Sequence, residues 1–280
     1  MQKKYLLLIF SLLVFCLQGF NQNIHQTLSI ANQLKEQNQF AEATIYYERV
    51  YFFDKSQIFH PQITQYIAEC YQKSENYPKA IVYYEIAKEL SDNKELYNKL
   101  SFNKTKCLIL NHNYAYGLIE LMNQNSESEN DKQWNLHAGI CSYGMEQYDD
   151  SKEYFLKIID KSNSEDSILV IKLFDKIKKY NKRLNPNKAK IMSLIIPGLG
   201  QFYCGNIKNG VNSLLLNGLL VYFMIDLSIT YFFVDALVGV GPWFQRYYMG
   251  GASNAERSAE KQMQKRKNEI YQQLMALVNT

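Results

Sequence analysis

Two aspartates, Asp226 and Asp235, lie in the most apolar part of the chain, between residues 191 and 241. An ionisable group in lipid is costly, so it is a functional candidate. A carboxylate dyad of the aspartyl-protease kind needs both groups on one face. Nine residues at about 100° each place them on opposite faces of one helix. We therefore expect Asp226 in a loop between two helices and Asp235 at a cap or near an interface. An intramembrane enzyme or transporter that uses both remains an alternative.

A glycine-rich segment, residues 197–205, has the composition of a phosphate-binding loop. A dinucleotide fingerprint requires a third glycine where Tyr203 stands. Gly200 and Gly205 have phosphate-loop spacing, but Asn206 follows in place of the lysine that would meet the phosphates. We therefore predict no nucleotide partner and no cofactor. The expected role is structural, because proline and glycine break a helix and allow another backbone to come close.

The cysteines and histidines do not have metal-site spacing, because the sequence contains no Cys-x-x-Cys pair and its four histidines are scattered. Cys70, Cys107 and Cys141 occupy the same position in a repeat. Stacked repeats hold equivalent sites about 8–10 Å apart or more, whereas a disulfide requires Cα atoms within about 7 Å. We expect three free and mostly buried thiols.

Self-similarity organises residues 21–163. A reference aromatic residue recurs at spacings of 37, 37 and 34 residues. Small residues stand nine positions before it and three after it, and a large residue stands seven after it. Antiparallel helices approach closely where small side chains face each other, and a bulky residue then fills the gap to the next pair. The predicted repeat-packing residues are Ala31, Phe40, Ala43, Ala68, Tyr77, Ala80, Thr105, Tyr114, Gly117, Gly139, Tyr148 and Ser151.

This pattern resembles the tetratricopeptide repeat (TPR), a 34-residue helical hairpin, and residues 38–43 and 76–80 match best. Two repeats are longer than 34 residues, and Lys104 occupies a usually apolar position. The early tryptophan position instead holds Thr27, Thr64, Ser101 and Asn135. The resemblance covers about half of the chain and implies an all-α solenoid of TPR-like repeats. An irregular helical bundle is the alternative.

Residues 164–190 are predicted to be a basic capping helix and linker. Lysines crowd one side of Ser164–Arg183, which suits anionic lipid headgroups. Asn185-Pro186 marks the break that follows. The expected apolar face of the helix consists of Ile168, Ile171, Leu173, Phe174 and Ile177.

Residues 191–249 are predicted to form a membrane domain. The apolar stretches Ile191–Cys204, Val211–Ile225 and Leu227–Val240 are each shorter than the about 20 residues of a simple span. We expect the first to be a broken or re-entrant element and the other two to form a short transmembrane helical hairpin. Trp243 and Tyr247 are typical of an aromatic belt at the headgroup level.

The membrane motif consists of Pro197, Gly198, Gly200, Gln201, Tyr203 and Gly205. It resembles the Pro-Gly-x-Gly-Gln-x-Tyr-x-Gly signature of small bacterial membrane domains of the TM2/DUF5683 type. The resemblance covers about 50 residues, implies a membrane location, and brings no chemistry with it.

The two ends of the chain have different signatures. Residues 1–20 are predicted to be an export signal, because two lysines precede the apolar run Tyr5–Leu17. Lipidation of Cys16 and retention as an uncleaved anchor remain alternatives. Residues 250–280 are predicted to be an amphipathic helix that begins at Ser253 or Asn254. Its stripe packs on its own protein or the membrane, or else docks a partner: Ala255, Ala259, Met263, Ile270, Leu274 and Leu277.

The composition limits the fold classes and the kinds of partner that we expect. Thirteen glycines and five prolines in 280 residues favour long helices over an all-β fold, and a net charge of +4 does not indicate a nucleic-acid partner. An export signal places the repeats in the periplasm. Basic residues flank the apolar block on both sides, and each flank prefers the cytoplasmic side. The side on which the C-terminal tail lies therefore stays open.

The leading hypothesis is a non-enzymatic, membrane-anchored interaction or scaffold protein of the bacterial cell envelope. Its expected partners are a protein or peptide on a Tyr-rich repeat surface and membrane lipid, without metal, nucleotide or nucleic acid. An accessory factor for membrane-protein insertion or envelope assembly is a narrower alternative, in which the membrane part is itself active.

Overall fold

The computed structural model describes residues 24–124, 131–159 and 164–278. Every regular element within these ranges is a helix, which confirms the all-α fold class. One helix of the described chain, α13 (Ile207–Thr230), is long and apolar enough to cross a membrane. The predicted export signal and Cys16 lie outside the described residues. The chain divides into two compact units, Met1–Ile158 and Ile159–Thr280, and each is considered by itself.

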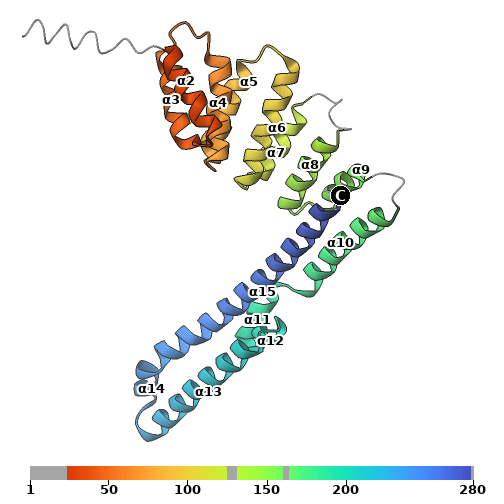
Figure 1. Ribbon diagram of the computed structural model, residues 1–280. Helices are drawn as coiled ribbons and strands as arrows, with labels where there is room; N and C mark the ends of the chain where they lie inside the picture. The colour runs from red at the N-terminus through yellow and green to blue at the C-terminus, as the bar shows by residue number, and fades with distance from the viewer. Residues whose placement is uncertain (1–23, 125–130, 160–163, 279–280) are drawn as a thin grey trace, which may run out of the picture. The chain divides into compact units, whose positions relative to one another are not determined.

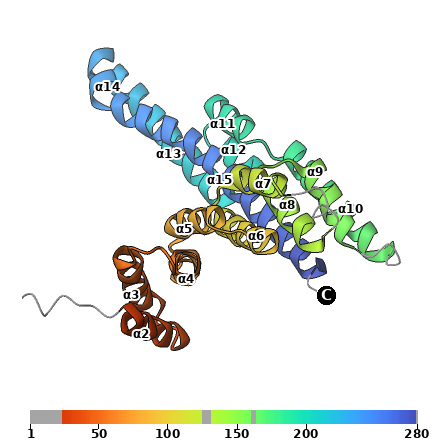
Figure 2. The same cartoon turned by 90° about the horizontal axis from the view of Figure 1, so that it is seen from above.

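The first unit is built from consecutive helix pairs. Each helix packs against the one before it and the one after it, so neighbours in sequence are neighbours in space (Figure 2). The pairs are α2 (Ile24–Glu36) with α3 (Phe40–Phe53), α4 (His60–Lys73) with α5 (Tyr77–Glu89), α6 (Lys94–Leu110) with α7 (Tyr114–Met122), and α8 (Lys132–Gly144) with α9 (Tyr148–Ile158).

The turn inside each pair has the same backbone geometry. A left-handed residue stands two positions before the reference aromatic, and the next N–H donates to the carbonyl five residues back. In the first pair Gln39 N donates to Leu34 O over 2.9 Å. This is the Schellman ending of a helix, usually made with glycine. Here the φ values are 59° at Asn38, 59° at Glu75, 59° at His112 and 62° at Glu146.

The twelve predicted repeat-packing residues lie at the contacts between the helices of the first unit or close to them. The reference aromatics Phe40, Tyr77 and Tyr114 are half-buried, and Tyr148 is buried. The small residues of the set are all buried: Ala31, Ala43, Ala68, Ala80, Thr105, Gly117, Gly139 and Ser151. The large side chains seven positions after the reference aromatic are fully buried: Tyr47, Tyr84, Leu121 and Phe155.

Two glycines show how closely these helices pack. A Cβ on Gly139 would lie 3.1 Å from the Phe155 ring, and a Cβ on Gly144 would lie 2.5 Å from the Tyr114 ring. Ser151 Oγ also donates a hydrogen bond to Gly139 O over 2.8 Å. Aromatic rings therefore lie directly on the backbone of α8.

The second unit is organised around one long helix, α15 (Gly241–Val278), which contacts all the other helices of the unit. Helix α13 runs beside α15, and α14 (Phe233–Gly239) lies at the turn between them (Figure 1). The remaining helices are α10 (Ser164–Arg183), α11 (Pro186–Ile195) and α12 (Leu199–Tyr203). Asn185 caps α11 by accepting from Lys188 N over 3.1 Å, so the predicted break lies at the start of this helix.

Two predicted boundaries in the second unit are wrong. Asp226 lies inside α13, which continues to Thr230, because an outward-facing acid does not interrupt helical hydrogen bonding. Helix α15 begins at Gly241 and passes through Gly250-Gly251, so neither Ser253 nor Asn254 is an N-cap. Gly251 lies against α13, where an added Cβ would meet Ser213 Oγ at 2.9 Å, whereas nothing lies within 4 Å of a Cβ on Gly250.

The apolar face of α10 differs in phase from the prediction. Ile168 and Ile171 are exposed, and Val170 is buried in their place. Val170, Phe174 and Ile177 follow the i, i+4, i+7 spacing of one helical stripe. Helix α10 packs against α15. Ile270 and Leu274, which belong to the predicted stripe of the C-terminal helix, are buried, so the stripe of α15 packs within its own unit. Capping of the repeats by α10 remains a prediction.

Candidate functional site

The membrane motif lies where α11, α12, α13 and α15 come together. Gly198 has φ = 92°, and a Cβ there would lie 2.3 Å from Gly210 O. A Cβ on Gly200 would lie 1.9 Å from Ala189 O, inside the backbone of α11. Half-buried Pro197 stands in the turn before α12, and Gly205, with φ = 75°, follows that helix. Gly198 and Gly200 therefore serve the close crossing of helix backbones, whereas Gly205, with nothing within 4 Å of an added Cβ, serves the left-handed turn after α12.

Gln201 connects three helices through its side-chain amide and is only 1% exposed. Its Oε1 accepts from Ser193 Oγ of α11 over 2.8 Å. Its Nε2 donates to Gly251 O of α15, also over 2.8 Å. Ser193 Oγ in turn accepts from Gly200 N over 2.9 Å. Both polar atoms of this buried amide have a hydrogen-bond partner, so its first role is structural.

Tyr203 ties the motif to the linker before α11. Its hydroxyl accepts from Asn185 N over 3.1 Å and donates to Arg183 O. The next residue, Cys204, is buried, and its Sγ lies 3.6 Å from Ala255 O of α15. The motif thus holds the linker, α11 and α15 in one arrangement.

A polar cavity of about 450 Å³ lies beside this junction, between α13 and α15. Arg246 is its only ionisable cation, and the lining contains no carboxylate. Asn217 is 2% exposed, and its Nδ2 donates to Ser213 O over 2.8 Å. Its Oδ1 is buried without a hydrogen-bond partner, as is Ser213 Oγ. The lining consists of Gln201, Asn209, Asn212, Ser213, Leu216, Asn217, Arg246, Tyr247, Gly250, Gly251 and Asn254.

Three residues of this cavity carry a prediction from the sequence, Gln201 in the membrane motif, Tyr247 in the aromatic belt and Asn254 as a helix cap, but none is predicted to belong to a polar site. Asn209, Asn212 and Asn217 stand in or beside the apolar stretch Val211–Ile225, which is predicted to be one helix of the membrane hairpin. Their spacing along α13 was the available signal, because amides three, five and eight positions apart recur on one side of a helix.

The two aspartates lie on different helices. Asp226 is exposed on α13, and Asp235 is exposed in the first turn of α14. Asp235 is not the cap of α14, because Phe232 holds the N-cap position, and the place of Asp235 near an interface stays a prediction. An acid in the first turn of a helix is favourable because it faces the positive end of the helix dipole.

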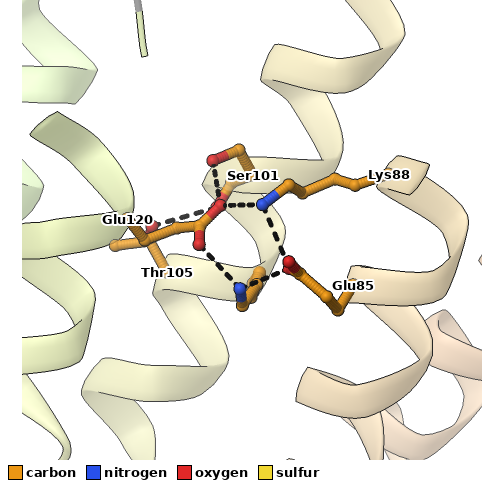
Figure 3. A network of polar contacts seen from close by, with 6 residues as sticks. Glu85, Lys88, Ser101, Thr105 and Glu120 are labelled. Carbon is orange, nitrogen blue, oxygen red and sulfur yellow. Dashed lines mark hydrogen bonds and ion pairs between the residues drawn. The ribbon is translucent and has the colours of Figure 1, made fainter. Parts of the chain in front are cut away.

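The first unit contains a buried ionic network between its second and third helix pairs (Figure 3). Glu120 joins Lys88 and Lys104, with Nζ–Oε distances of 2.5 and 2.7 Å. Glu85 pairs with both lysines, and lies 3.0 Å from Lys88 Nζ. Ser101 Oγ donates to Glu120 Oε1 over 2.5 Å. Two lysines and two glutamates make the network neutral.

The network shifts the titration of its members. Burial by itself raises the pKa of Glu120, but hydrogen bonds from Lys104, Lys88 and Ser101 outweigh it and hold this pKa below its ordinary value. Burial lowers the pKa of Lys88, and hydrogen bonds to Glu120 and Glu85 raise it above its ordinary value. Glu120 and Lys88 are therefore charged at neutral pH, and the network is a structural link.

Lys104 was the sequence signal for this network, since it fills a usually apolar position of the repeat. Its partners were not recognised, because Glu85 and Glu120 lie 19 and 16 residues away in sequence. Only the packing of α5, α6 and α7 brings them together.

A row of exposed apolar residues occupies one repeat position on three successive second helices. Ile45 of α3, Val82 of α5 and Ile119 of α7 each stand five residues after the reference aromatic. They are 65%, 56% and 53% exposed. The repeat alignment contained this row, but it was not singled out. We call Ile45, Val82 and Ile119 the apolar row.

The three repeat cysteines are free and buried, as predicted. Burial raises the pKa of Cys107 and of Cys141 to about 12. Burial likewise raises the pKa of Cys70, to about 11. These side chains therefore stay thiols at neutral pH and pack as small apolar groups.

No family model, no curated protein and no solved structure matches this chain. Its function is therefore argued from the residues and their geometry alone.

Proposed function

We propose that this chain is a membrane-anchored interaction protein of the bacterial cell envelope. The second unit is the anchor, and the first unit is a TPR-like solenoid that binds a protein or peptide. The two parts of this proposal depend on different surfaces and have separate tests.

The single observation that carries the anchor is the outer surface of α13. This 24-residue helix has only 11% of its most apolar window buried. At about 1.5 Å per residue it is roughly 36 Å long, enough for a hydrocarbon core of about 30 Å. Large apolar side chains cover its exposed side, and their contact with water would be unfavourable. They are Val211, Leu214, Leu215, Leu219, Val221, Tyr222, Phe223, Ile225 and Ile229.

The return of the chain supports a hairpin anchor. Helix α15 packs beside α13 after the short α14, which makes the turn of a hairpin (Figure 1). The residues that precede α13 and those that follow the first turns of α15 therefore lie at the same end of this hairpin. Both basic flanks then face the same headgroup surface. Trp243 and Tyr247 stack with ring centroids 6.4 Å apart in the first turns of α15, in keeping with an interfacial aromatic pair.

The apolar row supports recognition by the repeats. Exposed branched side chains recur at one position of three successive repeats, and in stacked repeats equivalent positions lie on the same side of the array. A contiguous exposed apolar patch marks an interaction site. The repeated Schellman turns and the small residues buried between helices support the solenoid arrangement.

The anchor is tested by membrane fractionation of the full chain carrying Ile225→Arg and Ile229→Arg, two exposed positions of α13 beyond the polar cavity. We expect the variant to leave carbonate-washed membranes, because an arginine on the lipid-facing surface of a span costs up to about 2.5–3.5 kcal/mol. Phe52→Arg with Ile58→Arg, two equal changes on the exposed surface of the first unit, is the matched control and should stay bound. A double variant that remains in washed membranes would refute the anchor.

Recognition by the repeats is tested with the apolar row changed to glutamate at all three positions. Cross-linked full-length protein is purified from membranes, and co-purified proteins are quantified by mass spectrometry. Three exposed glutamines on the first helices of repeats, Gln26, Gln62 and Gln133, changed to glutamate form the control. We expect proteins that are retained by wild type and control and lost with the row variant. Identical recovery from all three would refute recognition through this row.

A further inference from the structure

We propose that the cavity between α13 and α15 binds the headgroup of a glycerophospholipid whose end group donates hydrogen bonds. The phosphate lies against Arg246, and the donor, an ammonium or a hydroxyl, reaches Asn217 Oδ1. This inference rests on the proposed membrane anchor and names the lipid class that the anchor selects.

Arg246 supplies the anion-binding part of the site. It lines the cavity, and within the described residues it makes no ion pair. The other polar side chains of the lining are neutral amides and hydroxyls. A guanidinium among neutral donors suits a phosphate, which it can bind through two parallel hydrogen bonds. The absence of a carboxylate from the lining means that nothing there repels an anion.

Asn217 supplies the selective part of the site. Its Nδ2 is used by Ser213 O, and this hydrogen bond fixes the orientation of the amide, because a flip would set two carbonyl oxygens against each other. Asn217 lines the cavity, and its Oδ1 is a buried acceptor with no partner. A phosphate oxygen cannot satisfy an acceptor, whereas an ammonium or hydroxyl can. Ser213 Oγ, also unpartnered, can serve either group.

The surroundings favour a lipid over a soluble phosphate compound. Leu216 and Tyr247 belong to the lining, so the polar cavity has an apolar side. Leu215 and Leu219, next to the site on α13, are exposed and available to acyl chains. A second hollow that shares Asn209 and Asn254 with the cavity continues along α15 and adds two cations, Arg257 and Lys261, with Glu260 as its single acid.

The test uses the full chain, purified and delipidated in neutral detergent, with binding read by native mass spectrometry. Phosphatidylethanolamine and phosphatidylglycerol carry an end-group donor, and phosphatidylcholine carries none. We expect the first two to bind at least tenfold more tightly than phosphatidylcholine. Equal binding of all three, or preference for phosphatidylcholine, would overturn the proposal. The comparison needs no variant, so it holds even if substitutions impair folding.

Two variants separate the two contacts. Arg246→Gln should weaken binding of phosphatidylethanolamine and phosphatidylglycerol at least tenfold. Asn217→Leu should reduce their advantage over phosphatidylcholine to less than threefold. Arg266→Gln, on the same helix and outside the cavity, is the matched control and should bind as wild type. Unchanged binding by Arg246→Gln, or unchanged selectivity in folded Asn217→Leu, would overturn the assignment.

A further arm distinguishes the source of the phosphate. Acyl-free glycerophosphoethanolamine and inorganic phosphate are added as competitors. We expect neither to displace the lipid at a hundredfold excess, because both lack the acyl chains that contact α13. Efficient displacement by either would identify a soluble-phosphate site and overturn the lipid assignment. These measurements are made in detergent, so their failure is distinct from failure of membrane fractionation.

Discussion

Lys88 and Glu120 face each other across a buried contact, with Lys88 Nζ and Glu120 Oε1 2.5 Å apart and both side chains less than a tenth exposed. They come from α5 and α7, in different helix pairs, so their ion pair joins successive repeats. A buried pair of this kind gives little net stability compared with an apolar contact, but it makes either partner costly to remove, because the other charge is left in a poorly solvated place.

Glu120→Gln is therefore expected to destabilise the first unit by about 3 kcal/mol, the low end for a broken buried pair, since Lys88 and Lys104 keep Glu85. Unfolding in urea is followed by the emission of buried Trp134 in a Trp243→Phe background, so that only the first unit reports. Glu69→Gln breaks the half-exposed pair with Lys35 and should cost less than about 1 kcal/mol. Equal losses for the two variants would contradict the buried-pair argument.

Gly200→Ala is expected to disrupt the helix junction of the second unit. The added methyl would meet Ala189 O at 1.9 Å, and a backbone oxygen cannot move aside as a flexible side chain can. We expect a loss of about 3 kcal/mol, the upper part of the usual range for overpacking. Reaction of buried Cys204 with a thiol reagent, mapped by mass spectrometry, reports local opening.

Gly218→Ala is the matched control, because nothing lies within 4 Å of its added methyl. It also removes a helix-interior glycine, so Cys204 should react no faster than in wild type. Rapid reaction in both variants, or in neither, would mean that the junction does not depend on the glycine of the motif.

The repeat register was predictable because it depends on residue size at a fixed period. The small residues Ala43, Ala80 and Ser151 stand at one offset and are all buried, since only small side chains allow the helices of a pair to meet. The left-handed turns were not predictable in this way. Asn38, Glu75 and His112 share no chemical type, and their common φ follows from the helices that they join.

The polar sites were less accessible to sequence reasoning, because their partners are distant in the chain. Nothing local to Lys104 names Glu120 as its partner, and nothing local to Asn217 places Arg246 in the same cavity. The boundaries around Asp226 and Gly250 failed for a related reason. In a long apolar region the ends of the helices depend on how the helices pack, and α13 and α15 pack against each other.

Glu75→Gly is expected to stabilise the first unit by up to about 1 kcal/mol. A non-glycine residue in the left-handed region costs roughly 1–2 kcal/mol, part of which glycine gives back through the greater entropy of its unfolded chain. Thermal unfolding followed by Trp134 emission measures the gain. Glu153→Gly, an exposed position inside α9, should instead destabilise by about 1 kcal/mol. A loss at position 75 comparable with that at 153 would rule out relief of strain.

His137 is expected to make the first unit sensitive to acid. Burial, with a smaller effect of Lys106, lowers the pKa of His137 to about 4 from its ordinary value of 6.5. Between these values the unfolded chain binds a proton that the folded chain does not, so the free energy of unfolding is complete above pH 6.5 and falls as the pH drops towards 4. The slope attributable to His137 approaches about 1.4 kcal/mol per pH unit.

His137→Gln removes this titration, and urea unfolding at several pH values from 8 to 4 measures the difference from wild type. Glu85 and Glu120 titrate in both proteins, so their contributions cancel in that difference. The two curves should run parallel above pH 6.5, where the imidazole is neutral in both states, and the wild-type curve should fall more steeply below it. Parallel curves down to pH 4 would mean that His137 is protonated without cost in the folded protein, and its burial would then not govern the acid response.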